Sequence, residues 1–234
     1  MLAVSAAIIA GGPSAVHASS AEEGNATTTI TLNDGTVIES NAVAKVIGAE
    51  NAKLAYQLLR PEEKREFDRF MLPAESFGTS VTEPAVDQAV PQPASDAAPA
   101  DDVTRSLAGV SALAAKAKKG CWTTKARLGN KAKGGNTLFT YWVVLKWCAD
   151  GKKITKASIV EADGETSTPG WRYDGVKNKG ARVVNTVWAR GFAKHKFILG
   201  LAGWDVQNVD ACVRTFGMND GSQGVPDKVC SLYD

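Results

Sequence analysis

The spacing of hydrophobic positions changes near residue 120. From there to the C-terminus, apolar and polar residues alternate with a period of two, and β-branched and aromatic residues predominate, as is typical of β-strands. The run 136–149 (NTLFTYWVVLKWCA) is largely apolar on both faces and predicts a central strand of a packed sheet. Short strands at regular spacing, with turn residues between them, predict an antiparallel β-sandwich over residues 120–234.

Turn residues divide this half of the chain into separate strands. The Asp-Gly step at 150–151 predicts a turn, after which KKITKASIVEA pairs with the central strand as a hairpin. The Pro-Gly step at 169–170 interrupts the chain. The segment 181–200 predicts two strands around Gly191, and residues 204–216 predict a further strand.

Ahead of this half, apolar residues follow a helical period over residues 41–72. The Pro-Glu-Glu step at 61–63 predicts the first turn of a second helix. Residues 27–40 predict two short strands about the turn at 33–35. Two helices this short bury too little surface to stand alone, so we expect them to pack on the C-terminal domain, fold on a partner, or form a removable pro-segment. The expected apolar helix face comprises Ala42, Val46, Ala49, Leu54, Leu58 and Leu59.

Composition divides the chain into four parts. Residues 1–18 have the short apolar run and small-residue cleavage pattern of a signal peptide, the alternatives being a soluble Ala-rich helix or a start placed too far downstream. Residues 19–75 form a small segment with short helices. Residues 76–119 are a Pro- and Ala-rich linker. Its first part, residues 76–102, is expected to be disordered, and its last part, residues 107–119, is expected to form a short helix. No segment is long and apolar enough to predict a membrane span.

All four cysteines and all six tryptophans lie from Cys121 onward. An even number of cysteines in an exported domain predicts a disulfide framework, for which three pairings exist. We favour Cys121 with Cys148 and Cys212 with Cys230, and the crossed pairings stay open. The cysteines are too widely spaced for a zinc site, and no phosphate-binding glycine loop or dinucleotide fingerprint occurs. We therefore expect no metal and no cofactor.

The net charge of +2 hides an uneven distribution. Residues 120–234 hold 17 Lys and Arg against 10 Asp and Glu, whereas residues 1–119 hold 10 basic and 15 acidic residues. A basic domain of this kind can meet anionic wall polymers or nucleic acid. Alternatively, lysines on solvent faces keep strand edges from pairing and the protein in solution. We favour the second interpretation and expect no nucleic-acid partner.

The number of tryptophans exceeds what a sandwich core requires. Trp142 and Trp147 fall on opposite faces of one predicted strand, so one belongs to the core and the other can face solvent. Trp171 and Trp204 each follow a glycine at a predicted strand edge or loop, where exposed aromatic rings can stack on sugars. The other interpretation, which we favour, is that the tryptophans fill the core. The candidate ligand-binding residues are Trp171, Arg172, Tyr173 and Trp204.

Few residues suggest catalysis. A glycosidase needs two carboxyl groups about 5–9 Å apart across a cleft, whereas acids alternating around a glycine are more often a solvated turn or a weak calcium loop. His195, the sole histidine after export, lies between two lysines at a predicted solvent-facing strand position, which is poor for a general base. We assign no catalytic residue. The carboxylates considered are Glu161, Asp163, Glu165 and Asp205.

Four segments resemble secreted β-sandwich domains that are common in actinobacteria and lack an assigned activity. These segments are CWT at 121–123, TYWVVLKWCADGKKIT at 140–155, GETSTPGWRY at 164–173 and VWAR at 187–190. The resemblance covers about half of the chain and none of residues 19–119. It implies export and the fold, and it carries no catalytic residue across.

Together these features predict a secreted, extracellular and non-enzymatic protein that binds glycan or another cell-envelope polymer. The first alternative is a secreted hydrolase that uses a pair of the carboxylates named above. The second is an interaction or toxin-like protein whose leader masks the sandwich until it is cleaved.

Overall fold

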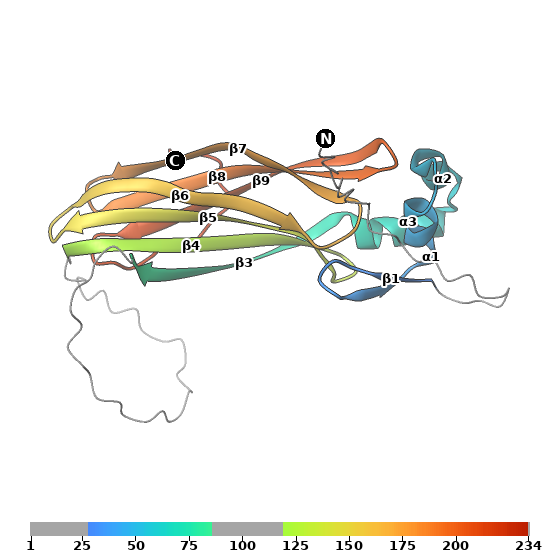
Figure 1. The fold of residues 1–234 in the computed structure, drawn as a ribbon, viewed down its shortest axis with the longest axis horizontal. Coiled ribbons are helices and arrows are strands. Elements are labelled where there is room, and N and C mark those ends of the chain that lie inside the picture. Colours follow the sequence, from blue (N-terminus) through green and yellow to red (C-terminus); the bar gives the residue numbers. More distant parts are fainter. Residues whose placement is uncertain (1–27, 86–118, 234) are drawn as a thin grey trace, which may run out of the picture.

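The computed structural model describes residues 28–85 and 119–233. Within these ranges three short helices precede the long strands, which run back and forth along the longest dimension of the molecule (Figure 1). The elements are β1 (Thr29–Thr31), β2 (Val37–Glu39), α1 (Asn41–Ile47), α2 (Ala52–Leu58), α3 (Pro61–Met71), β3 (Pro73–Pro84), β4 (Lys119–Ala132), β5 (Thr137–Asp150), β6 (Ile154–Thr166), β7 (Trp171–Val184), β8 (Trp188–Leu201) and β9 (Trp204–Met218).

The long strands form two antiparallel sheets. One has the order β3-β4-β5-β6 and the other β7-β8-β9, while β1 and β2 pair as a separate small hairpin. A strand of 14 residues such as β5 spans about 45 Å, which makes the body elongated, with the helices at one end (Figure 1). The mainly β, antiparallel sandwich predicted from the alternation of apolar residues is confirmed.

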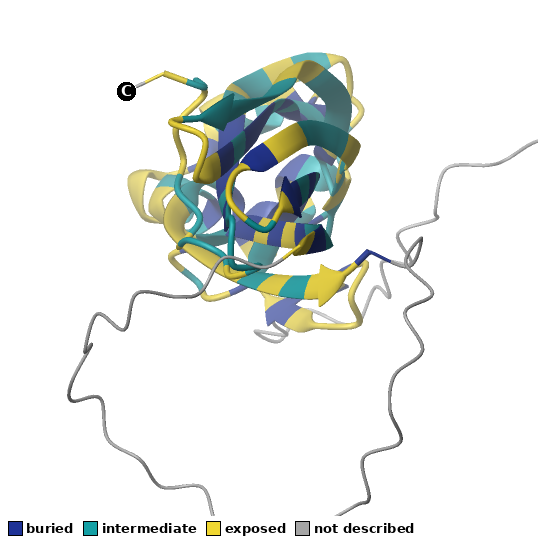
Figure 2. Cartoon of the chain, turned by 90° about the vertical axis from the view of Figure 1, so that its left-hand side faces the viewer, coloured by how far each residue is buried: buried dark blue, intermediate teal, exposed yellow. Residues whose placement is uncertain are grey.

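Aromatic side chains fill the space between the sheets. Phe139 of β5 stacks on Phe197 of β8 with ring centroids 4.1 Å apart, and viewed from one end the strands surround a buried interior (Figure 2). Trp147 is fully buried in a second cluster. A Cβ atom on Gly217 would lie 2.3 Å from the Trp147 ring, so only glycine lets β9 approach this ring so closely.

The N-terminal elements share this core with the sandwich. Phe67 and Met71 of α3 are fully buried in the same cluster as Phe139 and Phe197. The Asn136 side-chain amide donates to the backbone carbonyl of Phe70 at 2.9 Å. Of the three arrangements expected for the N-terminal helices, the structure shows packing on the C-terminal domain.

Local sequence features explain where the helices begin. The Ser40 hydroxyl accepts a hydrogen bond from Val43 N at 3.1 Å and caps α1, and α3 begins at Pro61 as predicted. The single apolar face expected over residues 41–72 is wrong at Leu54 and Leu58, which are 50% and 69% exposed. The chain turns between α1 and α2, so a period counted across both helices does not describe one face.

The linker prediction is wrong at its start, because residues 76–84 belong to β3 and pair with β4. Polar and small residues form this strand because it lies at the edge of the sheet, where burial of side chains is not required. The predicted signal peptide, residues 86–118 of the linker and most of the Ala-rich helix lie outside the described residues. Its last residue, Lys119, begins β4.

The turn expected near Gly191 lies at residues 185–187 instead. Asn185 and Thr186 adopt positive φ angles of 49° and 61° there, and β8 runs without interruption through Gly191. A Cβ on Gly191 would meet the side chains of Ile159 and Leu145 at 2.6 and 2.9 Å. This glycine therefore permits close packing between the sheets and does not mark a turn.

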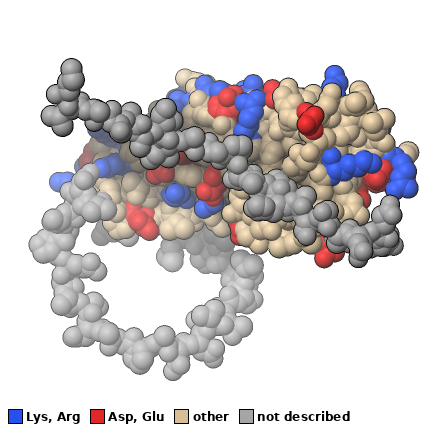
Figure 3. Space-filling view, turned by 45° about the vertical axis from the view of Figure 1, so that its right-hand side comes forward, with Lys and Arg blue, Asp and Glu red and all other residues tan. Residues whose placement is uncertain are grey.

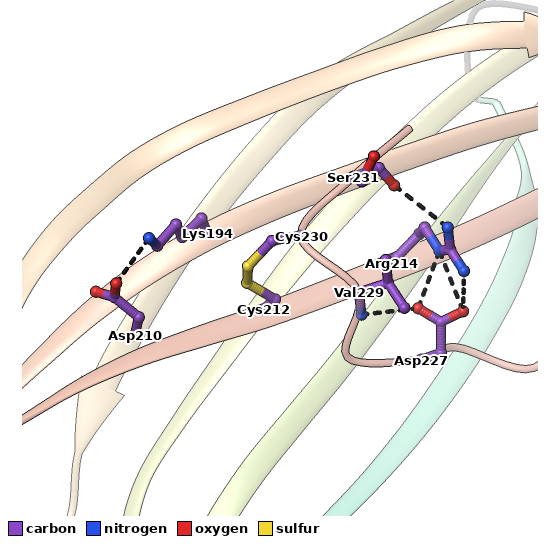
Figure 4. Close-up of a disulfide and its surroundings, with 8 residues drawn as sticks. All are labelled: Lys194, Asp210, Cys212, Arg214, Asp227, Val229, Cys230 and Ser231. Carbon is purple, nitrogen blue, oxygen red and sulfur yellow. Dashed lines mark hydrogen bonds and ion pairs between the residues drawn. A yellow bond between two sulfur atoms is a disulfide. The ribbon is translucent and has the colours of Figure 1, made fainter. Parts of the chain in front are cut away.

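Both favoured disulfides are confirmed. Cys121 and Cys148 lie directly opposite each other on β4 and β5, and Cys212 of β9 is bonded to Cys230 of the C-terminal tail, which we define as residues 219–233. The tail lies along the three-stranded sheet, where Asp227 accepts hydrogen bonds from Arg214 at 2.6–3.1 Å (Figure 4). No helix in the described ranges is long and apolar enough to cross a membrane.

Candidate functional site

The exposed position considered for Trp171 as a ligand-binding residue is wrong. Its side chain is 5% exposed, its ring lies 4.9 Å from that of Phe139, and its Nε1 donates to the backbone carbonyl of Met71 at 3.0 Å. The Pro-Gly step before it does make a turn, but α3 covers that end of the sandwich. Trp171 is therefore a core residue that joins the helices to the sheets.

The other three candidate ligand-binding residues are not gathered around a shared cavity. Trp204 is half-buried against Tyr56 of α2, with ring centroids 5.6 Å apart. Tyr173 hydrogen-bonds to the buried His195, and Arg172 is exposed and pairs with Asp205 at 3.0 Å. Trp204 is the first residue of β9 and follows a two-residue turn. Its ring is partly covered because Tyr56 of α2 packs against it.

A different tryptophan lies on the outer face of the four-stranded sheet. Trp142 and Trp147 fall on opposite faces of β5, as predicted: Trp147 is fully buried and Trp142 is half-buried. The Trp142 indole Nε1 donates to Glu161 of β6 at 2.5 Å. Lys125 Nζ and the Arg127 guanidinium of β4 lie 4.6 and 5.5 Å from its ring centroid. Side chains from both neighbouring strands thus hold the ring.

The side chains of Lys125, Arg127 and Glu161 also line a groove of about 490 Å³. Val81 and Val144 give it apolar surface, and the remaining lining side chains carry hydroxyl or charged groups. We call this groove and Trp142 together the Trp142 face. Its lining residues come from β3, β4, β5 and β6 and are Thr79, Val81, Glu83, Thr123, Lys125, Arg127, Val144 and Glu161.

The carboxylates considered for catalysis, including Asp163 of β6, are all exposed. Glu161 and Glu165 lie on the outer face of β6, with side chains about half exposed, and pair with Lys125 and Arg127. Asp205 lies on the other sheet, paired with Arg172. A general acid requires a carboxyl group in surroundings that exclude water, and these acids are exposed. The geometry therefore does not favour the hydrolase.

The solvent-facing position expected for His195 is also wrong, because its side chain is fully buried. It points inward with Ala193 and Phe197, while the two flanking lysines point outward. Burial lowers the pKa of His195 to about 4, despite the opposing attraction of Asp163. Its Nδ1 lies 2.9 Å from the Tyr173 hydroxyl, and its Nε2 has no hydrogen-bonding partner among the described residues.

Burial also keeps the two tyrosines beside His195 uncharged. The Tyr141 ring lies 5.4 Å from the imidazole, and burial raises the pKa of its hydroxyl to about 12. Burial and the charge of Asp163 raise the pKa of Tyr173 to about 12 as well. Both rings pack against Phe197 of the common core, so this cluster is part of the core.

An exposed tryptophan lies at the opposite outer face. Trp188, the first residue of β8, is 38% exposed and packs edge-on against Phe216. A groove of about 450 Å³ beside it is lined mainly by Val184, Val225 and Phe216, with Asn185 and Arg190 as polar members. This groove offers fewer hydrogen-bonding side chains than the Trp142 face does.

The alternation on β5 placed Trp142 and Trp147 on opposite faces without deciding which of them faces solvent, and nothing in the local pattern around Trp188 indicated exposure. Charge is not gathered by sign: lysines and arginines lie beside acids on the visible face (Figure 3). No group of three His, Cys, Asp or Glu side chains among the described residues could hold a metal ion. Comparison with protein-family models, curated proteins and solved structures finds no match for this chain. The resemblance to secreted actinobacterial domains therefore stays a prediction.

Proposed function

We propose that this protein is a secreted, non-catalytic module that binds a glycan or cell-envelope polymer through the Trp142 face. The observation that carries the proposal is a half-buried tryptophan on the outer face of the sheet, beside a groove lined mainly by hydroxyl and charged side chains. An aromatic ring provides a surface on which sugar rings stack, and polar side chains around it can hydrogen-bond the sugar hydroxyl groups. The two disulfides are consistent with an oxidising, extracellular location.

The existing contacts of Trp142 do not prevent a sugar from stacking there. The side chains of Lys125 and Arg127 are 47% and 44% exposed, and a cation–π contact at such a site contributes only about 0.5–1 kcal/mol. Both cations can move towards solvent or hydrogen-bond the ligand instead. The bond from Trp142 to Glu161 fixes the ring orientation before binding, which lowers the entropy cost of association.

The Trp142→Ala variant is expected to bind purified cell wall, and the responding members of a glycan array, about tenfold more weakly or worse. The loss follows from removing the stacking surface while the polar lining of the groove stays in place. Pull-down on cell wall and array titration measure it.

Trp188→Ala is the matched control, because it removes a tryptophan that is more exposed than Trp142 and lies on the opposite outer face. Near-UV circular dichroism and urea midpoints establish that both variants are folded. The proposal would be contradicted if Trp142→Ala bound the cell wall as strongly as the wild type does. A loss of binding in Trp188→Ala alone would contradict it as well.

The toxin-like alternative receives less support. A leader that is removed to unmask the sandwich must leave a stable body behind. Here Phe67 and Met71 belong to the common core, and Trp171 donates to Met71. Removal of α3 would expose this apolar surface to water, at a cost that scales with its area.

A further inference from the structure

We infer that the edge of β3 binds an extended, acidic polypeptide strand, independently of the glycan proposal. β3 pairs with β4 on one side only. A slot of about 450 Å³ runs along its other side, between residues 76–80 and residues 223–228 of the C-terminal tail. An edge strand with free backbone groups is a template for a further strand.

The direction of the β3 backbone groups follows from two hydrogen bonds. Ala85 N donates to Cys121 O at 3.0 Å. In an antiparallel pair, residues whose backbone N–H and C=O point to the partner strand alternate with residues whose groups point away from it. Odd-numbered residues from Glu75 on therefore bond to β4, and even-numbered residues direct N–H and C=O to the slot. In agreement, Ser80 O accepts from the Gln223 side chain at 3.1 Å.

The tail covers only part of this edge. Gln223 occupies Ser80 O and also contacts the Thr82 hydroxyl at 2.6 Å. The outward backbone groups of Ser76 and Gly78 have no hydrogen-bonding partner among the described residues, and both residues are exposed. Pro73 and Pro84 lie at the two ends of β3, where a missing N–H discourages uncontrolled pairing. The open stretch is therefore short and bounded.

The chemistry of the slot indicates the kind of partner. Alternating N–H and C=O groups at strand spacing match the backbone of an extended peptide. Leu128, Val225 and Pro226 supply apolar contacts for small side chains, and Lys228 is the one charged side chain of the lining. Lys228 is exposed, so it favours a partner with carboxylates near this end of the slot.

The test uses an acetylated and amidated peptide of alternating valine and threonine with two aspartates near one end. Addition of this peptide to the full chain is expected to slow amide hydrogen exchange at Ser76 and Gly78 but not at Thr79, which already bonds to β4. Because the slot is short, we expect weak binding that needs about millimolar peptide. No slowing at Ser76 and Gly78 under these conditions would overturn the inference.

Two variants at one position separate the backbone from the side chain. Ser76→Pro and Ser76→Ala both remove the hydroxyl that accepts from Asn130, but only proline removes the outward N–H. We expect Ser76→Ala to bind the peptide as wild type does and Ser76→Pro about tenfold more weakly. Equal affinities would overturn the inference, provided that near-UV circular dichroism shows both variants folded.

Charge is tested separately. Lys228→Glu is expected to weaken binding of the aspartate peptide several-fold. Binding of a peptide with asparagine in place of aspartate should be unchanged. Equal weakening of both peptides would contradict the acidic preference. Since Lys228 and Ser76 lie outside the Trp142 face, glycan retention by these variants should equal that of wild type, which keeps the two proposals distinguishable.

Discussion

Replacing Trp171 with alanine is expected to lower the free energy of unfolding by about 3–5 kcal/mol. The substitution removes a ring that is 5% exposed and packed on Phe139. It also removes the donor to the carbonyl of Met71. Because the ring lies between α3 and the sheets, we expect the packing of α3 to loosen as well. Urea denaturation followed by tryptophan fluorescence and by far-UV circular dichroism measures the loss.

Trp171→Phe separates the two contributions. Phenylalanine keeps most of the buried apolar area but leaves the Met71 carbonyl without its donor, which costs about 1–3 kcal/mol. A loss below about 1 kcal/mol for Trp171→Ala would show that the ring is not part of the core. The result also decides how binding data are interpreted, since loss of ligand binding in a Trp171 variant would report unfolding and not a lost contact.

Sequence alone predicted the fold because alternation and turn residues act locally. The hairpin at residues 150–151, the pairing of 152–162 with β5 and the opposite faces of Trp142 and Trp147 all follow from a period of two. Local features also favoured both disulfides. Cys121 and Cys148 lie on neighbouring predicted strands, and Cys212 precedes a tail with few apolar residues that a bond to Cys230 can hold in place.

The wrong predictions share a different cause, namely contacts between distant segments. Trp171 has the local pattern of a loop residue, but α3, about 100 positions earlier in the chain, covers it. β3 has the composition of a linker, yet its backbone pairs with β4 and so needs no apolar side chains. A short window of sequence shows neither that α3 covers Trp171 nor that β4 pairs with β3.

His195 was misplaced because the flanking lysines were given more weight than the period. Ala193, His195 and Phe197 share one face of β8, and the apolar residues on either side of the histidine identify that face as the inner one. A histidine whose neighbours at plus and minus two are both apolar should be assigned to the core. The physical consequence is a titratable group held uncharged inside the protein.

Acidification from pH 7 to pH 4 is therefore expected to remove about 3 kcal/mol of stability through His195 alone. In the folded state burial holds its pKa at about 4, against the ordinary value of 6.5. The unfolded chain consequently binds a proton at higher pH than the folded chain does. This contribution to stability is complete above pH 6.5, falls as the pH drops towards 4, and is not reduced further below that value.

The non-titrating variants His195→Phe and His195→Gln isolate this effect. Carboxylates such as Asp150 and Asp174, whose pKa values are lowered by hydrogen bonds and by nearby lysines, also reduce stability in acid, but they do so equally in variant and wild type. Phenylalanine loses the bond to Tyr173 and is expected to be less stable at pH 7 by about 1–2 kcal/mol. Its unfolding free energy should nevertheless decline less steeply on acidification.

Urea titrations at pH 7, 6, 5 and 4 give the comparison directly. Between pH 6.5 and 4 the unfolding free energy of wild type should fall more steeply than that of each variant, by up to about 1.4 kcal/mol per pH unit, which corresponds to one proton, and the slopes should agree below pH 4. Parallel curves over the whole range would mean that His195 takes up its proton without unfolding. The folded protein would then bind this proton with the ordinary pKa, which the full burial of the ring beside Tyr141 and Tyr173 opposes.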